Sequence, residues 1–260
     1  MRGELGFGIA AVPRDGTERL GPAVERMGYA ELWANDTRRG SGPETLAVAG
    51  AATRELRFGI GVMALSERGP QRMAAELAAA GAAGLPLERT TLGVGSGASR
   101  SLALVRSGVA ALRGLIPGQR IAVAAVGPRM CALGGEIADT VLLNWSLPAH
   151  LAEQRRWISD AAARAGRPVP RLTAYVRVAV GDAAEERLRA EMARYAGHSP
   201  AYAPLFADQP GLVGVAAPDA ASLRAALLPY RALLDCCVVR ALPDGDGVDD
   251  WLRVAEAAAP

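Results

Sequence analysis

Strand-like runs alternate with helical patterns along the whole chain, and no other feature of the sequence constrains the fold as much. Short runs rich in Val, Ile, Leu and Gly predict strands, whereas longer stretches with apolar residues three and four apart predict helices. The predicted strands cover residues 4–11, 30–33, 57–63, 90–94, 121–125, 140–143, 172–180 and 234–240. The predicted helices cover residues 17–27, 43–52, 71–84, 99–115, 129–136, 149–165, 183–195 and 248–258.

Repeated strand–helix units indicate parallel strands joined by helical crossovers, and eight such units in 260 residues fit a closed barrel. A doubly wound open sheet is the alternative, but it normally has fewer strands and a glycine fingerprint after the first one. Here the first strand ends in Ala10-Ala11-Val12-Pro13, without that fingerprint. We therefore expect an α/β fold, a (β/α)8 TIM barrel, with one domain over residues 1–260. The irregular segment 198–216, rich in Pro and Gly, is expected to be a loop on the substrate side.

The charge composition excludes several classes of function. The net charge is +2, and the 29 basic residues are all Arg and scattered along the chain, so no nucleic-acid surface is expected. The absence of Lys excludes a Schiff-base lysine and a lysine-dependent phosphate loop.

The cysteines and the N-terminus bear on the compartment. Cys131, Cys236 and Cys237 have neither metal-ligand nor disulfide-framework spacing, and we interpret them as small, buried, reduced residues. The sequence begins with Met1-Arg2-Gly3-Glu4 and passes directly into a strand-like run, without an apolar signal core or a membrane-length apolar span. We expect a cytoplasmic protein without a membrane partner.

The predicted strand ends carry glycines and small polar groups. Since ligand sites of such barrels lie at the C-terminal ends of the strands, function is sought there. The fourth strand ends in Gly93-Val94-Gly95-Ser96-Gly97, where bare backbone leaves room for a ring or a phosphate. No acid pair and no metal-ligand cluster follows any strand. We therefore expect the strand ends to bind a ligand rather than to form a hydrolytic or metal site. The other informative strand ends are residues 33–37, 59–63, 126–128 and 144–146.

These strand ends, taken in order, resemble those of the luciferase-like flavin and deazaflavin oxidoreductases, which are (β/α)8 barrels. The matching segments are residues 27–33, 52–62, 68–70, 92–97 and 121–128. The resemblance extends over nearly the whole chain. The chain departs from the family in the segment between Gly97 and Ile121. Only about two dozen residues separate these two positions, whereas family members have a longer segment there.

The resemblance implies a cofactor site at particular positions. It implies a non-proline cis bond at Gly61-Val62, in a bulge behind the cofactor's central ring. Asp36 occupies the position of an acid near the ring, so it is the catalytic candidate; the alternative is a cap after the strand. Trp145 is either a cofactor contact or a core aromatic residue. The full cofactor-binding set is Asn35, Asp36, Gly61, Val62, Met63, Ser96, Gly97, Val126, Gly127, Pro128, Asn144 and Trp145, of which residues 126–128 and 144–145 resemble the segments that hold the polar tail and phosphate.

Two departures bear on chemistry. Thr37 and Ala98 stand where deazaflavin-dependent sugar dehydrogenases have His and Glu, so sugar-phosphate oxidation is not expected. For His150 and His198 a solvated role is favoured over catalysis.

The resemblance implies an oxidoreductase that binds coenzyme F420 and transfers hydride to or from a small organic substrate. One alternative is an FMN-dependent monooxygenase, and another is a non-catalytic flavin- or deazaflavin-binding barrel. A homodimer through the Ala-rich helix at residues 73–83 is also possible, although packing of that helix against its own barrel is the favoured interpretation.

Overall fold

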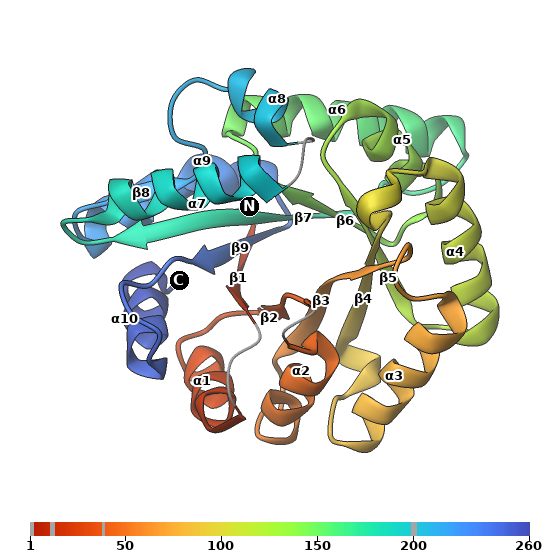
Figure 1. Cartoon of the computed structure of the whole chain (residues 1–260), viewed down its shortest axis with the longest axis horizontal. Coiled ribbons are helices and arrows are strands. Elements are labelled where there is room, and N and C mark those ends of the chain that lie inside the picture. The colour runs from red at the N-terminus through yellow and green to blue at the C-terminus, as the bar shows by residue number, and fades with distance from the viewer. Residues whose placement is uncertain (1–2, 11–13, 38–39, 199–201) are drawn as a thin grey trace.

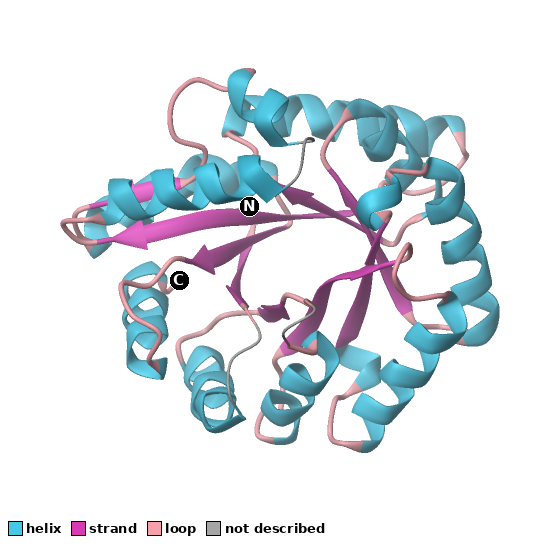
Figure 2. Cartoon of the chain, viewed as in Figure 1, coloured by secondary structure: helices cyan, strands magenta, loops and turns pink. Residues whose placement is uncertain are grey.

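The strands close into a ring that is surrounded by helices (Figures 1 and 2). The computed structural model describes residues 3–10, 14–37, 40–198 and 202–260. In these residues the ring order is β1, β2, β3, β4, β5, β6, β7 and β9, and β9 pairs with β1 to close it. All of the pairings in the ring are parallel. The predicted (β/α)8 barrel is therefore confirmed.

The ring strands lie close to their predicted positions. They are β1 (Glu4–Ile9), β2 (Glu31–Ala34), β3 (Arg57–Ala64), β4 (Thr90–Gly95), β5 (Arg120–Ala125), β6 (Thr140–Asn144), β7 (Arg171–Val180) and β9 (Cys236–Ala241). The helices after the first seven ring strands are α1 (Arg14–Arg26), α2 (Gly42–Ala51), α3 (Pro70–Ala82), α4 (Leu102–Leu115), α5 (Pro128–Ile137), α6 (Pro148–Arg164) and α7 (Ala184–His198), and α10 (Val248–Ala258) follows β9.

The sequence prediction was wrong about the segment before β9. The stretch expected to be irregular contains the short helix α8 (Tyr202–Ala207) and the strand β8 (Val215–Ala217), and a long helix, α9 (Ala220–Leu233), follows them. β8 pairs with the far end of β7, beyond the part that pairs with β6, and so it lies outside the ring. Helix α9 begins at Asp219, whose side chain accepts a hydrogen bond from the backbone N–H of Ser222.

The start of α4 also differs from the prediction. Residues Gly97–Ser99 form a 3₁₀ turn, and Arg100 has a left-handed conformation with φ of 51°. The α-helix begins only after Ser101, whose hydroxyl accepts a hydrogen bond from the N–H of Leu104. This extra turn follows directly after the glycine run and places Ser96 and Gly97 at the mouth of the barrel.

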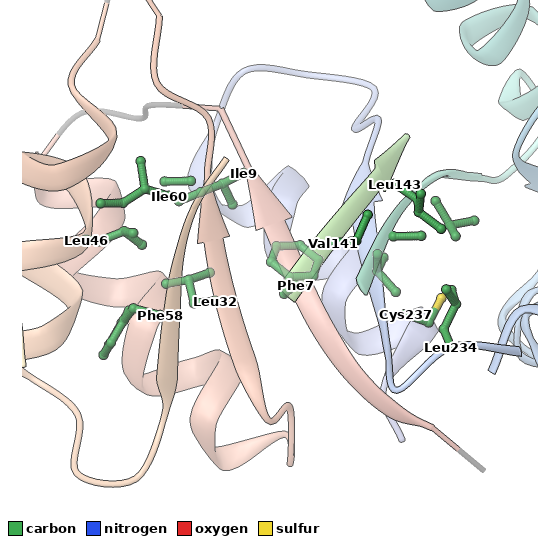
Figure 3. Packing of buried hydrophobic residues seen from close by; sticks show 14 of the residues in the cluster. Phe7, Ile9, Leu32, Leu46, Phe58, Ile60, Val141, Leu143, Leu234 and Cys237 are labelled. Atoms are coloured by element: carbon green, nitrogen blue, oxygen red, sulfur yellow. The ribbon is translucent and has the colours of Figure 1, made fainter. Parts of the chain in front are cut away.

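The core has two layers because every ring strand buries both faces. Side chains that point outward from the strands pack under the helices, as Phe7, Ile9 and Ile60 do (Figure 3). The inward-pointing side chains form a separate cluster that includes Trp33, Leu142 and Tyr175.

The N-terminal end of the barrel is closed by charged side chains. Glu31 is bound by Arg57 and Arg171 at 3.2 and 3.0 Å, and its other oxygen accepts a hydrogen bond from Trp33 Nε1 at 2.7 Å. Both arginines also contact Glu4. Since this end is filled, the opposite end of the barrel is where a ligand can enter.

Two features are absent from the described residues. No described helix is both long and apolar enough to cross a membrane. In the same residues, no group of three or more His, Cys, Asp or Glu is arranged to hold a metal ion.

Candidate functional site

A large cavity opens at the C-terminal ends of the strands. Its volume is about 1290 Å³, larger than the 300–1,000 Å³ typical of small-ligand pockets, so an elongated cofactor fits beside a substrate. All but two of the predicted cofactor-binding residues line it. The lining residues among them are Asn35, Asp36, Gly61, Val62, Ser96, Gly97, Val126, Gly127, Pro128 and Asn144.

The third strand bulges into this cavity at the predicted place. The Gly61–Val62 peptide is cis, and the register of β3 against β4 shifts between Ile60 and Met63. Gly61 and Val62 therefore line the cavity, whereas Met63 is fully buried in the outer core and does not. A Cβ on Gly61 would lie 2.1 Å from the hydroxyl of Tyr175, so only glycine leaves room for that phenol.

The glycine run ends in a turn that requires glycine for the fold itself. Gly97 has φ of 60°, and a Cβ there would lie 2.1 Å from Ser66 Oγ. Gly95 is less constrained, because its Cβ would meet only the side chains of Val62 and Ala124 at 3.1 and 3.7 Å. Gly95 and Gly97 thus both line the cavity, but only Gly97 is required by its backbone conformation.

The fifth strand leads into the N-terminus of α5, where an anion can bind. Gly127 is the N-cap residue and offers no side chain to the first turn, so the backbone N–H groups there have no side-chain cap. A Cβ on Gly127 would meet no atom within 4 Å. Arg100 and Arg129 line the same cavity and add positive charge.

Asp36 is held by two partners. Its carboxylate lies 2.7 Å from Arg68 Nη2 and accepts a hydrogen bond from the N–H of Gly42 at 3.0 Å. The Asp36 side chain is only 3% exposed. Burial lowers the pKa of Arg68, but Asp36 and Glu76 outweigh this effect and raise it. These contacts favour the capping alternative for Asp36, although the residue still lines the cavity.

Trp145 lies in an aromatic cluster beneath the cavity. Its φ is 57°, its ring is 1% exposed, and it makes edge contacts with Tyr195 and Phe206. It does not line the cavity, which favours the core alternative. Its neighbour Asn144 does line the cavity and donates a hydrogen bond to the Tyr202 hydroxyl at 3.3 Å.

A profile of the luciferase-like monooxygenases matches residues 8–103 and 106–227. The chain belongs to the luciferase-like monooxygenase family.

The similar proteins include both deazaflavin and flavin enzymes. A 5,10-methylenetetrahydromethanopterin reductase from Methanolobus tindarius is 24% identical in an alignment of length 199 that covers 62% of this luciferase-like chain and 60% of that protein. An F420-dependent secondary alcohol dehydrogenase, solved with an F420–acetone adduct, superposes with a TM-score of 0.80 over 100% of both chains, at 14% identity.

On the flavin side, the oxygenating constituent of 3,6-diketocamphane monooxygenase from Pseudomonas putida, solved with FMN, gives a TM-score of 0.69 at 16% identity. That match covers 100% of this chain and 97% of that one. At such identities the structural matches show the shared fold. A flavin or deazaflavin cofactor is consistent with these relatives, and they do not distinguish the two.

The luciferase-like barrel also holds two buried arginines that the sequence reasoning missed. Arg177 on β7 and Arg240 on β9 are 1% and 7% exposed. Arg240 donates to Asn35 Oδ1 at 3.1 Å, and Arg177 donates to Asn144 Oδ1. The signal in the sequence was a single charge inside each apolar run, because such a charge is costly unless the site uses it.

The guanidinium of Arg177 lies between aromatic rings. Its central carbon is 4.1 Å from the Trp145 ring centroid and 5.0 Å from that of Tyr195. Its Nε is buried without a hydrogen-bond partner. Burial and the nearby charge of Arg177 lower the pKa of Arg240. Positive charge is thus concentrated under the cavity.

The two positions at which this chain differs from the deazaflavin-dependent sugar dehydrogenases lie at the cavity, as the resemblance implied. Thr37 and Ala98 both line it. His150 does not; its ring makes an edge contact with Trp157 on α6. The side chain of His198 lies outside the described residues.

Proposed function

We propose that this chain is an oxidoreductase that binds coenzyme F420 and transfers hydride between it and a small organic substrate. The observation that carries the proposal is the cavity wall itself. The cis Gly61–Val62 peptide, the glycine turn at Gly95–Gly97 and the uncapped start of α5 at Gly127 all face one space.

The residues present fit such a cofactor. The bulge at Gly61 and Val62 offers a flat backbone surface for a ring system, and Gly95 adds no bulk beside it. The N–H groups of the first turn of α5, with Arg129, would hold the phosphate of the cofactor's tail. When bound, F420 would supply or accept the hydride, and the chain's part is to orient ring and substrate and to exclude water.

Asn35, Asn144 and Asp36 have supporting parts in this proposal. The two amides face the cavity and are each fixed by a buried arginine, so they would contact polar edges of the ring or the substrate. Asp36 is proposed to anchor the end of β2 through Arg68 and Gly42. A catalytic role for its carboxylate stays a prediction, and the stability of the Asp36→Ala and Asp36→Asn variants separates the two roles.

Two other functions are each favoured by a specific observation. An FMN-dependent monooxygenase would use the same ring and phosphate contacts, and the fold is shared with FMN enzymes. A non-catalytic binding barrel is favoured by Thr37 and Ala98, which remove the usual acid and base from the cavity.

Titration of the protein with F420 and with FMN, followed by cofactor fluorescence, tests the proposal. Tighter binding of F420 is expected, tighter binding of FMN would support the monooxygenase, and binding of neither would refute all three functions. If a cofactor binds but is never oxidised or reduced in the presence of a panel of enones, imines, ketones and aldehydes, the result would support the non-catalytic binding barrel.

Gly127→Val tests where the cofactor lies. The added side chain has room in the protein alone, so the fold is retained while the space for the phosphate is filled. We expect binding to weaken by at least about tenfold, which corresponds to about 1.4 kcal/mol. The control is Gly114→Ala on α4, where a Cβ also meets nothing within 4 Å and no cavity residue is changed. Equal affinities for the two variants would contradict this placement.

A further inference from the structure

Three tyrosines line the cavity, and arginines face all three, but only at Tyr195 does their charge outweigh the effect of burial on the phenol. Tyr175 lies on β7 in the barrel interior, Tyr202 lies on α8, and Tyr195 lies on α7. Figure 1 shows α7 running along β7, the strand that carries Arg177. The hydroxyl of Tyr175 is near a carbonyl oxygen, that of Gly61, at 3.5 Å, and the hydroxyl of Tyr202 is near the amide of Asn144.

Several charged groups face Tyr195, and the uncharged rings of Trp145 and of Tyr202 on α8 also pack against it. Arg177 on β7 has its guanidinium carbon 5.0 Å from the ring centroid, and Arg194 on α7 has its own at 4.8 Å. Arg240 on β9 also interacts with the phenol. A carboxylate, that of Glu191, also faces it and is paired with Arg194 through hydrogen bonds of 2.8 and 2.7 Å. The balance of charge around Tyr195 is therefore positive.

A phenolate at this position would be stabilised by the surrounding charge. The Arg177 guanidinium is buried, leaves Nε without a hydrogen bond, and faces a carboxylate, that of Glu191, which Arg194 already binds. A negative oxygen nearby would compensate a charge that is otherwise costly to bury. Burial alone would raise the pKa of Tyr195, but Arg177 and Arg240 outweigh it and hold that pKa below its usual value.

The lowered pKa distinguishes Tyr195 from the other tyrosines. Burial raises the pKa of Tyr175 and of Tyr202 above the ordinary value. The same holds for Tyr29 and Tyr230 outside the cavity. The chain has five tyrosines, so Tyr195 is expected to be the first to ionise.

We propose that Tyr195 is the acid–base residue of the cavity and that it exchanges a proton with the oxygen of a carbonyl or alcohol substrate. The inference rests on the proposed hydride-transfer function. It supplies the proton-transfer group that Thr37 and Ala98 cannot provide, and the carboxylate of Asp36 is already bound by Arg68 and Gly42. Arg177 is a positioning residue, since it acts through the phenol.

Proton transfer from Tyr195 accompanies the hydride transfer. In the reducing direction the carbonyl carbon gains a hydride, and the π electron pair of the C=O bond moves onto the oxygen. That oxygen forms a bond to the hydroxyl proton of Tyr195, and the electron pair of the O–H bond stays on the phenolate beside Arg177. Once the product has left the cavity, a proton from solvent water restores the phenol. Oxidation of an alcohol is the reverse of these steps.

Titration of the full chain without cofactor, following tyrosinate absorbance in the near ultraviolet, tests the acidity directly. One phenol should ionise before the other four, and Tyr195→Phe should remove that early step. Tyr202→Phe, which changes the neighbouring phenol, should keep it. Arg177→Met should move the step to higher pH, and Glu191→Gln, which removes the facing negative charge, should move it to lower pH. An early step that is absent from the native protein, or that persists in Tyr195→Phe, overturns the proposal.

Turnover with reduced F420 and simple ketones, and with oxidised F420 and the matching alcohols, tests the chemistry. Tyr195→Phe should lower kcat by about 10²-fold or more and remove the pH-dependent limb of its profile, with cofactor affinity unchanged. Unchanged kcat in Tyr195→Phe, or no reaction with any ketone or alcohol while F420 binds, overturns this inference and leaves the proposed cofactor intact. Failure of F420 to bind refutes the proposed function instead, and the two failures are thus distinguished.

Discussion

Replacement of Asp36 separates a structural from a catalytic carboxylate at the end of β2. Asp36→Ala removes the hydrogen bond to the N–H of Gly42, which acts as a cap of α2 and contributes about 1 kcal/mol. It also removes the charge-assisted contact with Arg68, which is 17% exposed, at about 2 kcal/mol. Arg68 retains Glu76 at 2.9 Å, so its charge keeps one partner.

The expected loss is therefore about 3 kcal/mol in the free energy of unfolding. For a chain of this length it corresponds to a fall in Tm of about 6 °C. Asp36→Asn keeps an oxygen for Gly42 and loses only the charge, so its loss should be about 2 kcal/mol. Ser41→Ala is the control, because Ser41 caps the same helix through one bond to Glu44 at 3.3 Å and should cost about 1 kcal/mol.

Urea unfolding followed by tryptophan fluorescence measures these differences, with equal m-values required for the comparison. The structural interpretation is refuted if Asp36→Ala is no less stable than Ser41→Ala. If Asp36→Asn keeps the stability of the native chain and loses turnover, the carboxylate is catalytic, as the family resemblance suggested.

Three further measurements test the packing and charges. Gly59→Ala should lose about 1–3 kcal/mol, since its Cβ would lie 2.1 Å from the Trp33 ring, whereas Gly114→Ala should not destabilise the chain; equal stabilities would contradict the packing. The three cysteines are fully buried, and burial raises the pKa of two of them to about 12, so a thiol reagent at neutral pH should label none before unfolding and all after it. Rapid labelling of the native chain would be the contrary result. Glu25 and Glu191 have lowered folded-state pKa values, because hydrogen bonds and positive neighbours outweigh burial. Their stabilisation is present above the unfolded value of 4.5 and is lost as pH falls through the folded pKa values, so Glu25→Gln should flatten the acid limb of stability. An unchanged acid limb would argue against it.

Local patterns were enough to predict most of the barrel. The apolar runs at β3 to β7 and the helices between them follow from residue periodicity, which depends only on neighbours in the sequence. Helix α9 was not predicted, because it is Ala- and Leu-rich, contains Pro229 and lies next to a Pro- and Gly-rich segment, which weakens its helical pattern. The short strand β8 has only three residues and exists because the far end of β7 offers it a free edge.

The sequence by itself determined the family and the strand ends that line the cavity, and its resemblance to that family implied the cis Gly61–Val62 peptide. Those features lie in short contiguous motifs, in which neighbouring residues specify the backbone. Only the tertiary structure decided the partners of Asp36, the burial of Met63 and Trp145 away from the cavity, and the convergence of Arg177, Arg240 and Tyr195. These side chains come from strands and helices far apart in the sequence, and the charge around a phenol depends on distances that only the closed barrel sets.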